Sequence, residues 1–558
     1  MAKEIADVLI IGSGASGGPF AWFLSQLAGV KVVCLEQGDW PEKATYSSNG
    51  EGDGQRQRLT TPPSPQAGVR HFRNGYPYDY TQSDWQPILG HAVGGGSVHY
   101  SAVWARLHPS DFVARSLDGV ADNWPITYWD LAPYYDLNDR TVGVAGIPGN
   151  TAYPPAAADA ERQPPVRLSR NAQILSRGFK KLGWHWWPTD QAILTRPHRG
   201  RKPCLTGCAT CDDGCPRNAK NSSDVVYWPE AIKNGVVLKT RARVREVTVN
   251  ARGLADGVVY YDADGRLQQQ KARVVVIACN GVGTPRLLLN SKSKLFPHGL
   301  ANSSGLVGKG LMGHPGAGAT GQFDSDQADP RGDVTNGLCS AEHCESDVRR
   351  GFARGFWWLS TGYQGPVTAA LGEPQMPTAT LTPPALRSPY VNASLRWGAS
   401  HHRVFQDTYS HTVSASALLD ELPEDANRVE LHPTLTDDVG VPAAKIIHRV
   451  GENTAKMGEF VIERAKEVLQ AAGATKITAT RKATPGAHHL LGTARMGADP
   501  RRSVVDQWGR AHDVKNLFII DGSVFPTSGS CTPTSTIQAL ALRTADYLKK
   551  NSREVLGS

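Results

Sequence analysis

Residues 5–18 read IADVLIIGSGASGG, and this stretch decides the fold. The β-branched, apolar run over residues 5–11 predicts a buried strand, and the apolar spacing beyond the glycines predicts a helix. Gly12, Gly14 and Gly17 therefore form a G-x-G-x-x-G turn between a strand and a helix. The first glycine allows the tight turn, the second lets the backbone approach a diphosphate, and the third lets the helix pack on the strand. We expect the diphosphate on the free N–H groups of the helix N-terminus.

A second strand is predicted over residues 30–35, and it ends at Glu36, about 20 residues beyond the glycine turn. A carboxylate at this place accepts hydrogen bonds from the ribose hydroxyls of a dinucleotide. Gln37 stands where an arginine would indicate a 2′-phosphate, so NADP is disfavoured. These residues predict a Rossmann-like α/β domain and leave the choice between NAD and FAD open.

The same strand and helix pattern returns later in the chain. Residues 272–278 predict a strand buried on both faces, followed by a helix that begins at Pro285. Residues 516–521 predict another strand, and a last helix is expected to begin at Pro533 with Thr532 as its N-cap.

Residues 317–482 lack this pattern and predict a separate α+β region with one amphipathic helix. We therefore expect a nucleotide domain built from residues 1–316 and 483–558, interleaved with a substrate domain over residues 317–482. Residues 38–84 are rich in Gly, Pro, Ser and Gln and predict a loop that covers the cofactor or faces the substrate.

The composition excludes several classes of protein. The 558 residues carry a net charge of +8, with 40% hydrophobic and 20% charged residues. No apolar run approaches the roughly 18 residues of a membrane-spanning helix, and no recognition motif or basic stripe indicates nucleic acid. The N-terminal residues show neither a secretory signal nor a twin-arginine motif, so the chain taken alone predicts a cytoplasmic protein.

Four cysteines gather in residues 203–220, PCLTGCATCDDGCPRNAK, with the spacing C-x3-C-x2-C-x3-C-P. This spacing is close to a ferredoxin run and favours an iron–sulfur cluster, with Cys204, Cys208, Cys211 and Cys215 as its candidate ligands. Structural thiols or disulfides and a zinc site are the alternatives. Elsewhere, Cys339 and Cys344 are close enough in sequence to pair, and the tryptophans around residues 184–187 and 356–358 predict either core or a sugar-stacking surface.

Five segments resemble the glucose–methanol–choline (GMC) oxidoreductases in order and spacing: GSGASGG with Glu36, VGGGSVH (93–99), NGVGTPRLLL (280–289), HHLLGTARMG (488–497) and NLFIIDGSVFPTSGS (516–530). The chain looks most like bacterial FAD-dependent sugar and alcohol dehydrogenase subunits with a cysteine cluster, which implies an iron–sulfur cluster of three or four irons. The resemblance implies FAD rather than NAD, and a substrate domain with an antiparallel sheet over the flavin.

The resemblance also implies roles for single residues. His489 matches the family's catalytic histidine, which takes the hydroxyl proton while hydride leaves for flavin N5. Thr532 stands where the family has a second catalytic histidine or asparagine, so that role is in doubt here. Contact with the cofactor is implied for Gly95, Ser97, His99, Asp521 and Pro533, and His99 stands where some members attach FAD covalently.

The sequence therefore predicts an FAD-dependent dehydrogenase that oxidises an alcohol group of a sugar, glycoside or small polyol. The cysteine cluster would pass electrons to a cytochrome or quinone acceptor. The related dehydrogenases imply a small partner subunit with its own export signal, which would place the complex in the periplasm. An oxidase that uses O2, with structural cysteines, and a non-redox FAD-containing lyase or binding protein are the alternatives.

Overall fold

The computed structural model describes residues 5–43, 76–84, 87–154, 162–205, 211, 214–324, 337–360, 401–408, 411–479, 482–486 and 488–555. Most of the predicted loop over residues 38–84 lies outside this part of the chain, and so does Cys208. Among the described residues no helix is long and apolar enough to cross a membrane.

Seven strands form the first sheet, in the order β5-β2-β1-β8-β7-β6, with β16 also paired to β8. Their bounds are β1 Ala6–Ile11, β2 Val32–Leu35, β5 Val237–Lys239, β6 Arg243–Val249, β7 Ala255–Tyr261, β8 Leu267–Ile277 and β16 Leu517–Ile519. The long β8 pairs antiparallel with β7 through its first half and parallel with β1 and β16 through its second half. The end of the chain thus completes the sheet that its beginning starts, as the sequence predicts.

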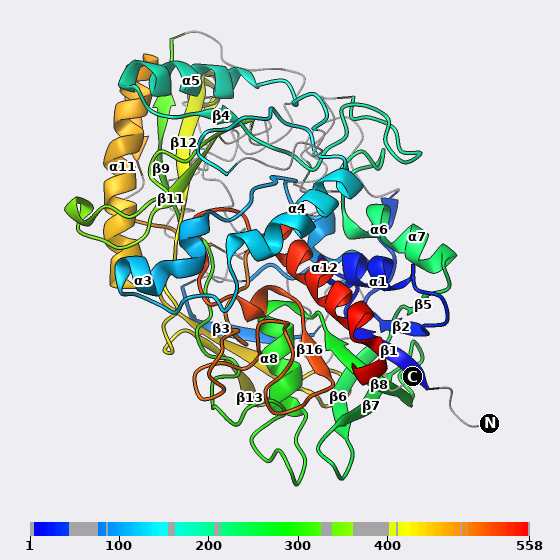
Figure 1. Cartoon of the computed structure of the whole chain (residues 1–558). Helices are drawn as coiled ribbons and strands as arrows, with labels where there is room; N and C mark the ends of the chain where they lie inside the picture. Colours follow the sequence, from blue (N-terminus) through cyan, green and yellow to red (C-terminus); the bar gives the residue numbers. More distant parts are fainter. Residues whose placement is uncertain are drawn as a thin grey trace.

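Alternate residues of the parallel strands enter two different cores. Leu9 and Val275 belong to one buried cluster, whereas Val8 and Val274 belong to the other. Helices α1 (Gly17–Leu24) and α12 (Thr534–Lys550) cover the face of the second cluster, and α8 (Asn280–Asn290) lies on the face of the first (Figure 1). Burial on both faces explains why these strands are apolar without alternation.

Two helices begin at different residues from those predicted. Helix α8 starts at Asn280, because the Asn280 side-chain oxygen accepts hydrogen bonds from the N–H groups of Val282 (2.9 Å) and Gly283 (3.1 Å) and caps the first turn. Pro285 therefore lies inside the helix. Its missing N–H leaves the Gly281 carbonyl without a helical donor, and the Thr493 hydroxyl donates to that oxygen instead, at 2.8 Å.

Helix α12 starts at Thr534, with Pro533 as the N-cap residue and no side-chain capping bond. The prediction that Thr532 caps this helix is wrong. Its hydroxyl is buried and has no hydrogen-bond partner in the part of the chain that the structure describes.

The second sheet is antiparallel and has the order β15-β9-β12-β11-β10-β4. Its strands are β4 Trp187–Pro188, β9 Gly316–Gln322, β10 Leu338–Ser340, β11 Phe356–Ser360, β12 Thr412–Leu419 and β15 Lys476–Ala479. Helices α11 (Glu452–Ala472) and α5 (Arg170–Leu182) cover one face of it (Figure 1). Since α5 and β4 precede residue 317, this sheet and its helices extend beyond residues 317–482.

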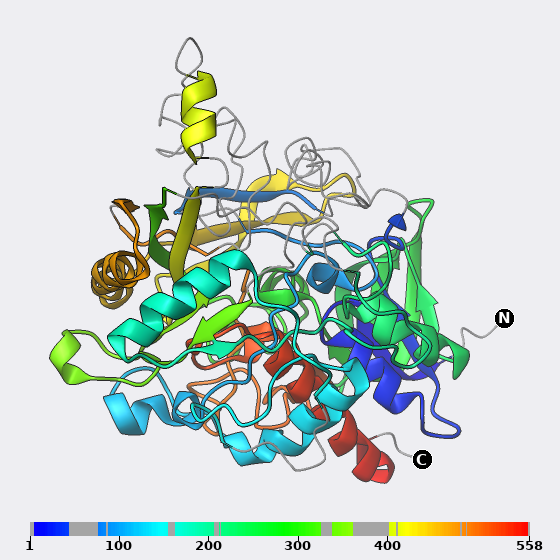
Figure 2. The ribbon, with the colours of Figure 1, turned by 90° about the horizontal axis from the view of Figure 1, so that it is seen from above.

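The remaining elements connect and flank these layers (Figure 2). A three-stranded sheet joins β13 Arg428–Thr436, β14 Pro442–His448 and β3 Tyr78–Ser83. The other helices are α3 Ala114–Asp118, α4 Tyr128–Val142, α6 Ser223–Val226, α7 Trp228–Lys233, α10 His401–Thr408 and α13 Ser552–Val555. Short 3-10 turns occupy Gly95–Val98, Pro109–Val113, Val348–Arg350 and Gly522–Val524.

The tryptophans and the two cysteines for which the sequence suggested a role lie in the second sheet or next to it. Trp357 and Trp358 are buried in the core and neither lines the main pocket, so these side chains are core residues. Cys339 and Cys344 are free thiols, and the predicted pair is wrong. Each thiol donates instead to a separate backbone carbonyl, that of Trp187 for Cys339 (3.6 Å) and that of Phe356 for Cys344 (3.5 Å).

Candidate active site

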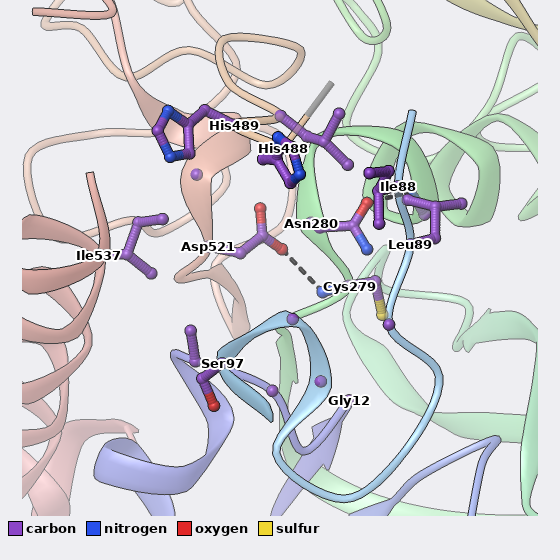
Figure 3. A pocket seen from close by; sticks show the side chains of 18 of the residues that line it. Gly12, Ile88, Leu89, Ser97, Cys279, Asn280, His488, His489, Asp521 and Ile537 are labelled. Atoms are coloured by element: carbon purple, nitrogen blue, oxygen red, sulfur yellow. Dashed lines mark hydrogen bonds between the residues drawn. The ribbon is translucent and has the colours of Figure 1, made fainter. Parts of the chain in front are cut away.

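A large pocket lies where the glycine turn, the carboxyl ends of the first sheet and the uncovered face of the second sheet meet. In Figure 3, Gly12 and Ser97 lie on one side of it, His488 and His489 on the opposite side, and Asp521 and Cys279 between them. Of the residues predicted from sequence to bind the cofactor or act on the substrate, ten line this pocket: Gly12, Gly14, Glu36, Gly95, Ser97, His99, His489, Asp521, Thr532 and Pro533.

The glycine turn has the geometry that its spacing predicts. A Cβ on Gly12, which has φ +97°, would lie 2.4 Å from the Ala278 carbonyl oxygen, and one on Gly17 would lie 2.1 Å from the Gly12 carbonyl oxygen. Both positions therefore require glycine, and Gly17 is the point at which α1 packs on β1 without lining the pocket. A Cβ on Gly14 would meet only Gly95 Cα, at 3.7 Å, so its open side is left for a ligand.

Glu36 lies at the end of β2, where the sequence places it. One carboxylate oxygen accepts from the backbone N–H (2.9 Å) and the hydroxyl (2.7 Å) of Ser13, and the other accepts from the N–H of Gly38 (2.8 Å). Burial raises the pKa of this carboxyl, while the hydrogen bonds from Gly38 and Ser13 oppose the shift. The side chain is thereby held at the edge of the pocket as a fixed acceptor.

The second glycine segment closes over the first. Gly94 and Gly95 both have positive φ, and a Cβ on Gly95 would lie 2.8 Å from Gly14 Cα. The Ser97 hydroxyl donates to the Gly94 carbonyl (2.6 Å) and accepts from the Ser223 N–H (3.0 Å), so it holds the loop in shape. His99 follows with its side chain exposed at the pocket wall.

Asp521 joins the ends of β16 and β8. One of its oxygens accepts from the Cys279 N–H (2.8 Å) and the Thr284 hydroxyl (2.6 Å), and the other accepts from the Ser523 N–H (2.9 Å). Cys279 and Asn280 line the pocket beside it, a place that the sequence analysis did not foresee. The positive φ of Asn280, +66°, is what turns the chain from β8 into α8 at the pocket wall.

His489 contacts His314, a histidine that was not predicted as a site residue from the sequence. Its Nδ1 lies 2.9 Å from Nδ1 of His314, and the two rings are nearly perpendicular. Nε2 of His314, a buried side chain, lies 2.9 Å from the Gly529 carbonyl oxygen. Burial, together with the nearby rings of His314 and His488, holds the pKa of His489 well below 6.5. His314 directly precedes the second sheet, in His-Pro-Gly, and only the fold brings it to residue 489.

The N-terminus of α12 completes the wall. Thr532, Pro533 and Thr534 all line the pocket, and the helix that follows is 17 residues long. Its first N–H groups carry the partial positive charge of the helix dipole and favour negative charge in the pocket. The Thr532 hydroxyl, which has no partner among the residues that the structure describes, lies in the same wall and offers one donor and acceptor group there.

The chain matches two family profiles described as GMC oxidoreductase, an N-terminal one over residues 72–316 and a C-terminal one over residues 423–541. The chain belongs to the GMC oxidoreductase family. The resemblance inferred from the five sequence segments is thereby confirmed, and so is the enzyme class. The family supports FAD as the cofactor of this protein.

Curated relatives of this GMC oxidoreductase span nearly the whole chain. A 2-methyl-1,2-propanediol dehydrogenase of Mycolicibacterium austroafricanum is 36% identical over 100% of this chain and 97% of its own. The fructose dehydrogenase large subunit of Gluconobacter japonicus is 30% identical, with 98% of each chain covered. The 6'''-hydroxyparomomycin C oxidase of Streptomyces lividus is 30% identical over 98% of this chain and 91% of its own.

Solved structures confirm the fold. The pyridoxine 4-oxidase from Mesorbium loti superimposes with a TM-score of 0.66 at 14% identity, covering 98% of this chain and 99% of its own. The formate oxidase of Aspergillus oryzae RIB40 superimposes with a TM-score of 0.63 at 15% identity, with both chains fully covered.

The cysteine loop of this GMC oxidoreductase lies behind the pocket wall. Lys220 is buried, and its ammonium group donates to the carbonyls of Val98 (2.6 Å), Tyr100 (3.0 Å) and Cys211 (2.6 Å). It therefore ties the loop to the residues on either side of His99. The described part of the loop, which includes Cys204, Cys211 and Cys215 but not Cys208, holds no group of three side chains that could bind a metal ion.

Proposed function

We propose that this protein oxidises a CH–OH group with FAD as hydride acceptor and His489 as the general base. The observation that supports this most is the position of His489 on the pocket wall opposite the glycine turn (Figure 3). FAD, when bound, supplies the electron acceptor that no amino-acid side chain supplies. Gly12, Gly14 and the α1 N-terminus suit its diphosphate, and Glu36 suits its ribose.

His489 is suited to take the substrate's hydroxyl proton. With its pKa well below 6.5 the ring is neutral at pH 7 and presents a lone pair, and a base of this kind contributes roughly 10²- to 10⁴-fold to the rate. The Thr532 hydroxyl is the second polar group that we assign to the substrate. It cannot replace the amide or cationic partner that the family has at this place, so it orients the substrate without adding charge.

The substrate class we propose is an alcohol group on a small polyol, glycoside or sugar. The named relatives act on a diol, on fructose and on aminoglycosides, which supports this range without selecting within it. The test is anaerobic mixing of the holoenzyme with 2-methyl-1,2-propanediol, fructose, gluconate and simple alcohols while the flavin spectrum is recorded. Bleaching by one of them supports the proposal, whereas an oxidised spectrum with all of them favours the non-redox alternative.

We propose a dehydrogenase rather than an oxidase, because the 36% identical relative and the fructose relative are both named dehydrogenases. The aminoglycoside relatives are named oxidases, which keeps the oxidase as the second candidate. An oxygen electrode separates the two. Rapid turnover with O2 as sole acceptor would select the oxidase, and turnover only with a quinone or dye would select the dehydrogenase.

We further propose that Cys204, Cys208, Cys211 and Cys215 hold an iron–sulfur cluster that serves a cytochrome or quinone acceptor. Their spacing supports this, and so does the bond network of Lys220 that ties the loop to the pocket wall. The described cysteines alone do not make up a metal site, so no step of the mechanism above passes through the cluster. Iron and acid-labile sulfide assays on anaerobically purified protein decide it: three or four of each per flavin support the cluster, and none refutes it.

Two proposals concern assembly and attachment. We propose a small partner subunit that carries the export signal and would place the complex in the periplasm; the name of the fructose relative, a large subunit, supports the existence of a second subunit. Co-purification of a second chain from the native host would support that partner. The place of His99 on the pocket wall supports covalent FAD attachment there, and complete loss of flavin from the protein on acid precipitation would refute it.

A further inference from the structure

The hydrogen bonds around His314 determine which nitrogen of His489 is available as a base. The Gly529 carbonyl can only accept a hydrogen bond, so Nε2 of His314, 2.9 Å away, must carry its hydrogen. In a neutral imidazole the other nitrogen is then an acceptor. Nδ1 of His314 therefore accepts from Nδ1 of His489, 2.9 Å away, and Nδ1 of His489 must carry the hydrogen.

We infer that His314 is a positioning residue for the reaction: it fixes His489 in the tautomer whose Nε2 carries the lone pair that takes the substrate proton. This inference rests on the proposed function of His489. A His489 ring in the other tautomer would present an N–H at Nε2 and could not act as a base there. The same contact serves after proton transfer, because the Nδ1–H of a protonated His489 still donates to His314.

His314 is itself held rigidly, which the role requires. Its side chain is only 3% exposed, and its ring centroid lies 4.8 Å from that of His489 at an angle of 83° between the planes. Gly529, which fixes the tautomer of His314, follows Ser528, and the Ser528 hydroxyl donates to a carboxylate oxygen of Asp420 at 2.6 Å. The residue before Gly529 is thus hydrogen-bonded to Asp420, which directly follows β12, and this bond holds the Gly529 carbonyl in place.

The charged groups around His314 and His489 support a neutral His314. Asp420 and Glu421 are the acidic groups that act on His314, and burial nevertheless lowers the pKa of His314. Asp420 is paired with Arg354 (3.1 Å) and Glu421 lies 3.0 Å from His448, so neither carboxylate is directed at His314 alone. On the other side His488 is the titratable neighbour of His489.

The test compares anaerobic flavin reduction by a reactive alcohol in the holoenzyme and three variants. His314→Phe removes the acceptor while keeping the ring volume, and we expect the limiting rate of reduction to fall about 10- to 100-fold, a part of what a general base contributes. The substrate concentration that gives half of this rate should stay nearly unchanged. His314→Asn places an amide oxygen where Nδ1 lies, and we expect it to recover much of the lost rate.

His343→Phe is the matched control, because His343 is also a buried histidine, stacked on Phe356 with centroids 4.9 Å apart, but does not line the pocket. We expect it to reduce its flavin at the wild-type rate. A His314→Phe enzyme that is as fast as wild type, or a His314→Asn enzyme no faster than His314→Phe, would overturn the inference. If His314→Phe does not fold, the comparison of His314→Asn with wild type still tests the inference. A limiting rate of flavin reduction about 10- to 100-fold below wild type in His314→Asn would show that a hydrogen-bond acceptor at this place is not sufficient, and would overturn the inference.

His489→Asn separates this inference from the proposed function. An inactive His489→Asn with a fully active His314→Phe would refute the role of His314 and leave His489 as the base. An active His489→Asn would refute the proposed function itself.

Discussion

Replacing Gly17 by alanine should damage the fold, whereas the same change at Gly14 should damage cofactor binding. The new Cβ at residue 17 would lie 2.1 Å from the Gly12 carbonyl oxygen, where ordinary contact begins at 3.4 Å. Helix α1 or the turn must therefore move by about 1.3 Å, the difference between these two distances. Overpacking of this kind costs about 1–3 kcal/mol of unfolding free energy.

At residue 14 the new Cβ meets only Gly95 Cα, at an ordinary distance of 3.7 Å, and otherwise extends into the pocket. The polypeptide should accept it, while the diphosphate loses its close approach to the backbone. We expect FAD affinity to fall at least about tenfold, which corresponds to about 1.4 kcal/mol.

The assay is thermal unfolding of each variant at equimolar and at saturating FAD, together with a flavin-release titration. Gly17→Ala should unfold at a clearly lower temperature than wild type, and Gly14→Ala should unfold near the wild-type temperature only when FAD is in excess. Equal stability of Gly17→Ala and wild type would refute the packing argument. Wild-type FAD affinity in Gly14→Ala would refute the assignment of the pocket to the cofactor.

The other predictions concern the side chains of His489, Thr532 and Lys220. Because the pKa of His489 lies well below 6.5, the rate constant of flavin reduction should stay level from pH 6.5 upward and fall only in acid, as the lone pair is protonated. A stopped-flow pH series checks this. A rate that already falls above pH 6.5 would contradict it. Thr532→Val should leave the melting temperature unchanged, because the hydroxyl makes no cap bond. It should lower kcat/KM for the alcohol about 2- to 10-fold, which corresponds to the loss of one neutral hydrogen bond. An unchanged kcat/KM would show that Thr532 does not bind the substrate. Lys220→Met removes the donor from three carbonyls, of which that of Val98 is buried, and should lower the free energy of unfolding by about 2 kcal/mol or more in a urea titration. The exposed Lys181→Met should change it far less, and equal midpoints for the two variants would refute the structural role of Lys220.

The sequence predicted the first sheet well, because its evidence is local. The strand, glycine turn and helix over residues 5–24 lie within one short segment, and the close contacts of Gly12 and Gly17 leave no other residue type acceptable. Glu36 follows from the same unit. The division of the chain at residues 316 and 482 stays a prediction. The strand β4 pairs in the second sheet and the helix α5 packs on it, although both come before residue 316.

The errors occurred where a distant contact overrides a local rule. Pro285 reads as a helix start, yet the Thr493 hydroxyl satisfies the carbonyl that a proline leaves without a donor, so the helix passes through it. Thr532 also reads as a cap, but here no distant contact explains the error: the helix begins at Thr534, and the Thr532 hydroxyl has no partner among the described residues. His314 could not be found at all from sequence spacing, because 175 residues separate it from His489 and only the fold brings the two rings together.

We propose above all that His489 is the base of an FAD-dependent alcohol oxidation. The most direct measurement is the anaerobic rate of flavin reduction by a reactive alcohol in wild type and His489→Asn, with the flavin content of both checked by spectrum. We expect equal flavin content and a rate that is about 10²- to 10⁴-fold lower in the variant. A His489→Asn enzyme that binds FAD and reduces it at the wild-type rate would show that His489 is not the base.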